Sequence, residues 1–118
     1  MLSQKLHDAI NAQINAELWS AYLYLAMSMD AENKGQKGVA NWFYVQFQEE
    51  QDHARIFMNY LNSRDAKVTL LPIEEVPATW DSVLAMFQQT LAHEKKVTAL
   101  INNLAAIANE DRDFASIN

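Results

Sequence analysis

Apolar residues recur every three or four positions along three long stretches of the chain, and this spacing predicts three amphipathic helices. We expect them to span about residues 3–32, 39–62 and 79–110. All three stretches are rich in helix-favouring residues, and Ser3 and Thr79 stand where N-terminal caps are needed. The chain has two glycines and two prolines, all of which fall between the stretches: Gly35, Gly38, Pro72 and Pro77.

The two predicted connections differ in length, and this difference favours one topology. The first, residues 33–38, is short, which is typical of antiparallel neighbouring helices. The second, residues 63–78, reaches about 50 Å when extended, whereas a helix of about 24 residues is about 36 Å long. It can therefore cross the whole bundle and leave the second and third helices parallel.

The last residues of the chain have the pattern of a further helix that starts at about residue 113. Asp111 or Asp113 can cap it, and Phe114 and Ile117 would make its first apolar contacts. We therefore predict a single all-α domain, residues 1–118, in the form of a four-helix bundle with a long crossover between helices 2 and 3. Its fourth helix is only begun in this chain, so the fourth wall is expected from further residues or from another chain.

Carboxylates interrupt the apolar stripes near the middle of the predicted helices. Glu17 lies in the first stripe, Glu50 and His53 in the second, and Glu94 in the third. Singly, such residues are usually solvated surface groups. Together, three buried and unpaired carboxylates at several kcal/mol each would rival the roughly 5–15 kcal/mol that stabilises a domain. Because the stripes contain no Lys or Arg, a bound cation is the simplest compensation.

The spacing of these four residues is typical of a di-iron carboxylate bundle. A lone Glu, a Glu-x-x-His pair and a second lone Glu match roughly three quarters of that pattern. Carboxylate oxygens with one imidazole suit iron or manganese, with zinc as an alternative, and the absence of cysteine excludes thiolate ligands. We expect Glu50 to bridge two metals, while Glu17 and Glu94 each bind one.

Two further side chains extend this predicted site. Tyr24 follows Glu17 by seven residues on the same helix face, as an ordinary core tyrosine or as a hydrogen-bond or electron donor. Glu49 belongs either to an accessory cation site or to a hydrated helix face. His7 and His93 are predicted to be partly exposed polar residues.

The charge and hydropathy of the chain exclude several classes of partner. Fifteen acidic and nine basic residues give a net charge of −6, which repels phosphate backbones, so we expect no nucleic-acid partner. No apolar run approaches the roughly 20 residues of a membrane span, and the N-terminus lacks a signal-peptide pattern. We therefore expect a cytoplasmic protein without membrane contact, and the lack of cysteine agrees with a reducing compartment.

Three segments of the chain resemble the bacterial non-haem ferritins. They are NAQINAELWSAYLYLAM around Glu17, QEEQDH around Glu50 and His53, and LAHEKKVTALINNLAAIA around Glu94. The resemblance covers the whole chain and implies that the four residues are ferroxidase ligands for two irons. It further implies that Tyr24 is the tyrosine beside this site and that Glu49 belongs to an accessory iron site.

The resemblance also implies an assembly and a reaction. Such proteins form a homo-oligomeric shell of twenty-four subunits, in which dioxygen or peroxide oxidises ferrous iron and the ferric product is stored as a mineral. The family continues through a fourth helix, with a Gln and further Glu ligands, and a short fifth helix. These lie beyond the 118 residues of this sequence. A chain without them would lack a ligand for the second metal.

Other functions fit the sequence less well. A non-catalytic helical assembly module with at most a partial metal site agrees with the incomplete bundle, and it is the main alternative. A rubrerythrin pairs the bundle with a cysteine-ligated iron domain, and this chain has no cysteine. A DNA-protecting miniature ferritin builds its site between subunits, whereas here one chain supplies most of the inner ligands.

Overall fold

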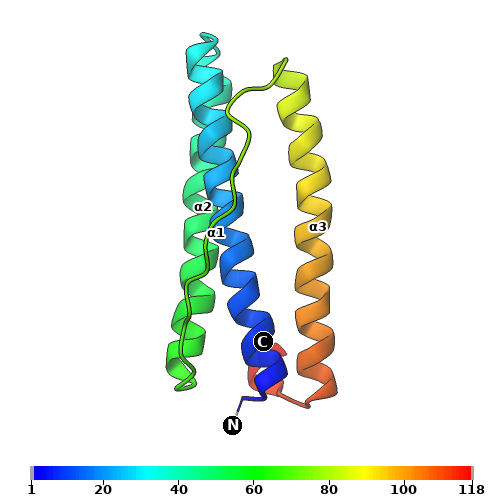
Figure 1. Ribbon diagram of the computed structural model, residues 1–118. Coiled ribbons are helices and arrows are strands. Elements are labelled where there is room, and N and C mark those ends of the chain that lie inside the picture. The colour runs from blue at the N-terminus through cyan, green and yellow to red at the C-terminus, as the bar shows by residue number, and fades with distance from the viewer. Residues whose placement is uncertain (1, 118) are drawn as a thin grey trace.

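The computed structural model describes residues 2–117 of the chain, with the side chains of all of these except Phe114 and Ile117. This part contains helices α1 (Gln4–Asn33), α2 (Lys37–Ser63), α3 (Val83–Glu110) and α4 (Phe114–Ile117). The three long helices lie side by side in an elongated bundle of 51 × 22 × 22 Å (Figure 1). The predicted all-α class with a long crossover between the second and third helices is confirmed, and the extent of the domain stays a prediction.

The connections set the direction of each helix. A tight turn at Gly35, whose φ of 76° suits a residue without a side chain, makes α1 and α2 antiparallel. The extended crossover, residues 64–82, then returns the chain to the other end, so α3 runs parallel to α2 (Figure 1). α3 packs mainly on α1, and it reaches α2 through long side chains such as Phe87, whose ring centroid lies 5.1 Å from that of Phe43.

The predicted cap of α1 is confirmed, whereas the predicted starts of α2 and α3 need correction. Ser3 caps α1 as predicted, because its hydroxyl accepts from the backbone N–H of Leu6. α3 begins at Val83 rather than at about residue 79, and its cap is Ser82 instead of Thr79. The carboxylate of Asp30 accepts the backbone N–H of the buried Trp80 at 3.0 Å, which keeps this end of the crossover extended. α2 also starts slightly earlier than predicted, at Lys37.

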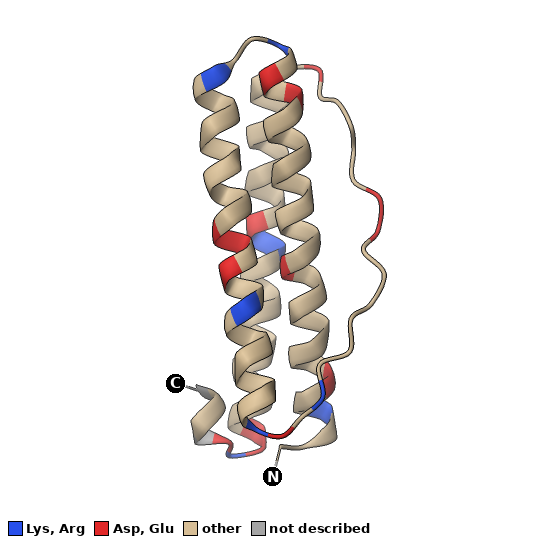
Figure 2. Cartoon of the chain, turned by 90° about the vertical axis from the view of Figure 1, so that its left-hand side faces the viewer, with Lys and Arg blue, Asp and Glu red and all other residues tan. Residues whose placement is uncertain are grey.

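Side chains of α1 hold the other part of the crossover against the bundle. The ring Nε2 of His7 donates to the carbonyl oxygen of Lys67 at 2.7 Å. The amide of Asn11 donates to the carbonyl of Thr69 and accepts its N–H, both at 2.8 Å. The crossover therefore follows one side of the bundle along its length (Figure 2). His7, predicted only as a partly exposed polar residue, is one of its anchors.

An ion pair fixes the place where α4 begins. The guanidinium of Arg64, just after α2, donates two hydrogen bonds to the carboxylate of Asp113, at 3.0 and 2.9 Å. These bonds hold the pKa of the Asp113 carboxyl below its usual value. Of the two predicted caps, Asp113 directly precedes α4, whereas Asp111 ends α3. The contacts predicted for the Phe114 and Ile117 side chains lie outside the described residues.

The interior consists of two apolar clusters separated by a polar layer. One cluster comprises Leu23, Tyr24, Met27, Ala31, Ala40, Phe43, Trp80 and Met86. The other comprises Leu6, Ile10, Ile14, Leu61, Ile107 and Ala108. Between them lie buried polar side chains, including Gln13, Glu17, Ser20 and Glu50. Figure 2 shows acidic positions about half-way along each long helix. The polar layer in the middle of the bundle therefore contains the candidate functional residues.

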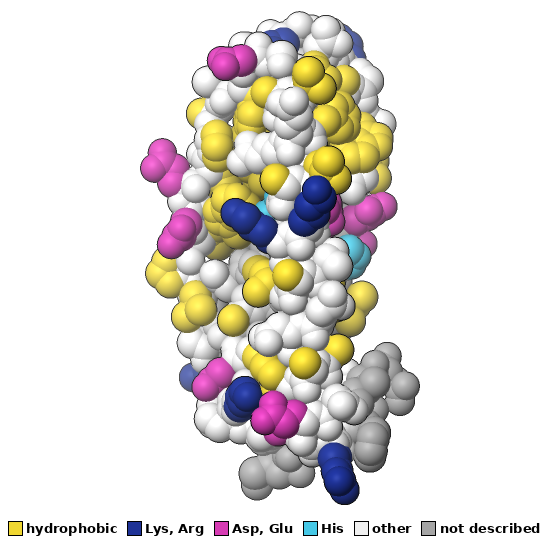
Figure 3. Space-filling model, turned by 90° about the vertical axis from the view of Figure 1, so that its right-hand side faces the viewer, with side chains coloured by type: hydrophobic (Ala, Val, Ile, Leu, Met, Phe, Trp, Pro, Cys, Tyr) yellow, Lys and Arg dark blue, Asp and Glu magenta, His cyan; other side chains and the backbone are white. Residues whose placement is uncertain are grey.

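α3 leaves much of its apolar surface uncovered in the described part of the chain. Apolar side chains lie among polar ones on the face that contains α3 (Figure 3). The exposed ones on this helix are Leu84, Phe87, Leu91, Leu100 and Ile101. Nonetheless, no helix within residues 2–117 is both long and apolar enough to cross a membrane.

Candidate metal centre

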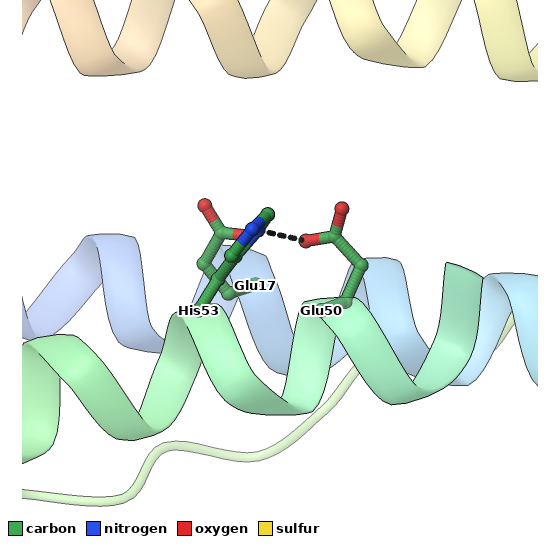
Figure 4. Close-up of side chains that lie close together, drawn as sticks. All are labelled: Glu17, Glu50 and His53. Carbon is green, nitrogen blue, oxygen red and sulfur yellow. Dashed lines mark ion pairs between the residues drawn. The ribbon is translucent and has the colours of Figure 1, made fainter. Parts of the chain in front are cut away.

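Three ionisable side chains from two helices meet in the polar layer. Glu17 comes from α1, Glu50 and His53 come from α2, and all three point toward the space beneath α3 (Figure 4). Each offers one ligand atom, and these atoms lie within 4.8 Å of one another. The Nδ1 atom of His53 lies 3.5 Å from Oε2 of Glu50 and 3.8 Å from Oε2 of Glu17.

Helix geometry explains how these residues come together. Glu50 and His53 are three residues apart, so they share one face of α2. Glu17 lies between Ile14 and Ala21 on the buried face of α1, which packs against α2. The carboxylates are buried, with side chains 2% and 7% exposed for Glu17 and Glu50, whereas the ring of His53 is 52% exposed. The cluster is thus closed on its carboxylate side and open on its imidazole side.

Each of the two buried carboxylates has one oxygen atom without a hydrogen-bond partner. Oε1 of Glu17 accepts a hydrogen bond from Nε2 of Gln13 at 2.8 Å. Oε2 of Glu17 and Oε2 of Glu50 are buried without a hydrogen-bond donor. Each such orphan acceptor costs about 1–3 kcal/mol. A cation between them would remove this cost, and two carboxylate oxygens with one imidazole nitrogen form a donor set that suits iron, manganese or zinc.

Without a metal, a proton takes the place of the cation. Burial raises the pKa of the Glu50 carboxyl to about 9, and a proton shared with Glu17 and the charges of Glu17, Glu94 and Glu49 act in the same direction. At neutral pH Glu50 therefore keeps its proton. Metal binding must displace this proton, so the affinity for a metal rises with pH.

This shift makes the stability of the metal-free protein depend on pH. Between the ordinary pKa of 4.5 and about 9, folded Glu50 holds a proton that the unfolded chain has lost. The free energy of unfolding therefore falls as pH rises through this window, by at most about 1.4 kcal/mol per pH unit and less where water screens the pair. Urea unfolding in a chelator should show this slope in the wild type. Glu50→Gln should flatten this slope. An equal slope in both proteins would contradict the assignment of the bound proton to Glu50.

Tyr24 binds Glu94, the third of the predicted carboxylate ligands. The buried hydroxyl of Tyr24 donates a hydrogen bond to Oε1 of Glu94, and burial, followed by this bond, raises the pKa of the tyrosine. The expectation that Glu94 points inward is wrong in one respect, because its side chain is exposed and lies outside the group of three. The reason is that, among the described residues, no helix covers this side of α3.

Glu49, the residue predicted for an accessory cation site, lies farther from the centre. Glu49 is exposed on α2, outside the group of three, and contributes to the centre only through its charge, which helps to raise the pKa of Glu50. Its predicted part in an accessory iron site stays a prediction.

His93 is the residue whose importance the sequence did not reveal. Its ring lies against Trp19 and Tyr24, with centroids 5.1 and 6.1 Å away, and its Nε2 lies 2.5 Å from the hydroxyl oxygen of Ser20. Burial lowers the pKa of this imidazole. The signal in the sequence was Ser20, a polar residue three positions after Glu17 that needs a hydrogen-bond partner when buried.

Comparison with known proteins agrees with this arrangement. Residues 7–118 match the ferritin-like domain model. A bacterial non-haem ferritin from Bacteroides fragilis is 40% identical over 116 residues, which is 98% of this chain and 73% of the relative. One from Staphylococcus aureus is 35% identical over 117 residues, 99% of this chain and 70% of the relative.

Solved structures show the same likeness in three dimensions. The open-pore ferritin from the hyperthermophilic archaeon Archaeoglobus fulgidus superposes with a TM-score of 0.98 at 43% identity. The match covers all of this chain and 73% of that one. Sequence and fold therefore lead to one conclusion: the chain belongs to the ferritin-like domain family and has bacterial non-haem ferritins as its relatives.

Proposed function

We propose that this protein oxidises ferrous iron with dioxygen or peroxide and stores the ferric product as a mineral in a homo-oligomeric shell. The observation that carries the proposal is the pair of unpartnered oxygens on Glu17 and Glu50, beside His53, in a chain of this family. Ferrous iron is the substrate, with two ions at each site. They supply the two electrons that reduce dioxygen to hydrogen peroxide, or peroxide to water, with two protons taken up.

Each residue of the site has a proposed part in this reaction. Glu50, central and proton-bearing in the absence of iron, bridges the two ions after its proton leaves. Glu17 and His53 bind one ion, as their convergence with Glu50 supports. Glu94 binds the other ion, with its carboxylate oriented by Tyr24. Glu49 attracts further iron from the exposed side of α2.

The assembly and location belong to the same proposal. The named relatives are ferritins, one of them an open-pore ferritin, and a shell of twenty-four subunits is the arrangement that we propose for this chain. The uncovered apolar side chains of α3 supply surface for contacts within or between subunits. We place the protein in the cytoplasm, and its net charge of −6 argues against nucleic-acid partners.

Iron oxidation is testable with the wild-type chain alone. Ferrous iron mixed with the protein in air should give ferric absorbance faster than the same iron in buffer. Zinc shares the ligand preferences but has no redox chemistry, so zinc added first should slow the reaction. Equal rates with and without protein would reject the proposed function.

A second candidate is a non-catalytic assembly module. The exposed apolar row on α3 favours it, because such surface is typical of interfaces. This candidate predicts that the stability of the protein is the same with zinc as with a chelator. A higher unfolding midpoint in zinc would count against it and in favour of the metal centre.

A further inference from the structure

Two polar contacts join α3 to α1 at the level of the metal centre. Ser20 and Tyr24 lie one turn apart on α1, and His93 and Glu94 are consecutive on α3. The His93 ring contacts the Ser20 hydroxyl at 2.5 Å, and the Tyr24 hydroxyl donates to the Glu94 carboxylate. Apolar contacts of Met86 and of Ile107 hold α3 toward its two ends, and these two polar contacts join it to α1 between them.

The protons of the first contact have a definite arrangement. The hydroxyl of Ser20 donates its single proton to the carbonyl oxygen of Ala16, at 2.9 Å. The proton between Ser20 and His93 must then come from the imidazole, so Nε2–H donates to Oγ. Trp19 lies against the ring at an interplanar angle of 54°, and Tyr24 meets it edge-on at 78°. One hydrogen bond and two aromatic contacts thus fix both the position and the rotation of the imidazole.

We propose that His93 is a positioning residue for the metal centre, acting through Glu94. Neighbouring residues on a helix are 1.5 Å apart along its axis and about 100° apart around it. When the His93 ring is bound to Ser20, the rotation of α3 is set, and the Glu94 carboxylate is presented to the Tyr24 hydroxyl. This inference rests on the proposed function, because it takes Glu94 as a ligand of the second ion. Loss of ligand orientation typically weakens metal binding by about 10–100-fold.

Variants of His93 separate the hydrogen bond from packing. In His93→Gln, the amide nitrogen can reach the place of Nε2 and keep the donor. His93→Phe keeps an aromatic ring beside Trp19 and Tyr24 but loses the donor. Ser20→Ala removes the acceptor from the other side and leaves the imidazole in place. Circular dichroism shows whether each variant retains its helices.

Cobalt(II) is a suitable probe, because air does not oxidise it at these ligands and its visible spectrum reports coordination. Titration should show that His93→Gln binds cobalt like the wild type, while His93→Phe and Ser20→Ala bind the Glu94-dependent ion about 10-fold more weakly. In a Glu94→Ala background the same substitutions should have no further effect, because they act through that carboxylate.

The outcomes distinguish this inference from the function on which it rests. Wild-type affinity in folded His93→Phe would overturn the positioning role, as would an equal loss with and without Glu94. A wild-type chain that binds no cobalt would overturn both proposals. A chain that binds cobalt as expected, yet oxidises iron no faster than buffer, would reject the oxidation and leave the role of His93 supported.

Discussion

A Glu50→Ala protein is expected to oxidise ferrous iron roughly 100-fold or more slowly than the wild type. Glu50 lies between His53 of its own helix and Glu17 of α1, and burial, together with the neighbouring carboxylates, raises its pKa to about 9. Its removal takes away the proposed bridge between the two ions and leaves Glu17 and His53 with at most one. The measurement is the initial rate of ferric absorbance after ferrous iron is mixed with aerated protein.

Asp52→Asn is the matched control for this variant. Asp52 is an exposed acid on the same helix, two residues after Glu50, so its change removes a carboxyl group of α2 without touching the buried cluster. We expect it to keep nearly all the activity, since exposed charges act weakly through water. If Glu50→Ala oxidises iron as fast as Asp52→Asn, the buried cluster is not the site of oxidation.

The helices and the core of the site were predictable because both depend on short-range spacing. Glu50 and His53 share a helix face whatever the rest of the chain does. The short connection makes α1 and α2 antiparallel neighbours, and this brings Glu17 to the same level. Periodicity therefore sufficed to predict that these three residues converge.

The predictions that were wrong concern features that depend on contacts between residues far apart in the sequence. The start of α3 moves from Thr79 to Val83 because Asp30, fifty residues earlier, binds the backbone of Trp80. Glu94 is exposed because no helix among the described residues covers its side of α3, and its contact with Tyr24 depends on the rotation of α3. The hydrogen bond between Ser20 and His93 contributes to that rotation, and it joins residues 73 apart in the sequence. Propensity and periodicity carry no information about such pairs.

Replacing Phe43 by Ala should lower the free energy of unfolding by about 3–5 kcal/mol. Its side chain is 0% exposed, and its ring stacks on Tyr24 with centroids 6.2 Å apart. The loss would be a large part of the roughly 5–15 kcal/mol that stabilises a domain. Urea unfolding in the presence of a chelator measures it without a contribution from bound metal.

Phe87→Ala supplies the matched control, because Phe87 touches Phe43 but is 37% exposed. Since water already covers part of its ring, its truncation should lose only about 1–2 kcal/mol. Equal losses from both variants would mean that the region around Phe43 does not form a rigid core. Zinc then tests whether this core supports the metal centre. At about 100 times the dissociation constant of the wild type, zinc should stabilise both variants by about 2.7 kcal/mol, as it does the wild type. A smaller gain in Phe43→Ala alone would show that this core holds Tyr24, and through it Glu94, in place for the metal.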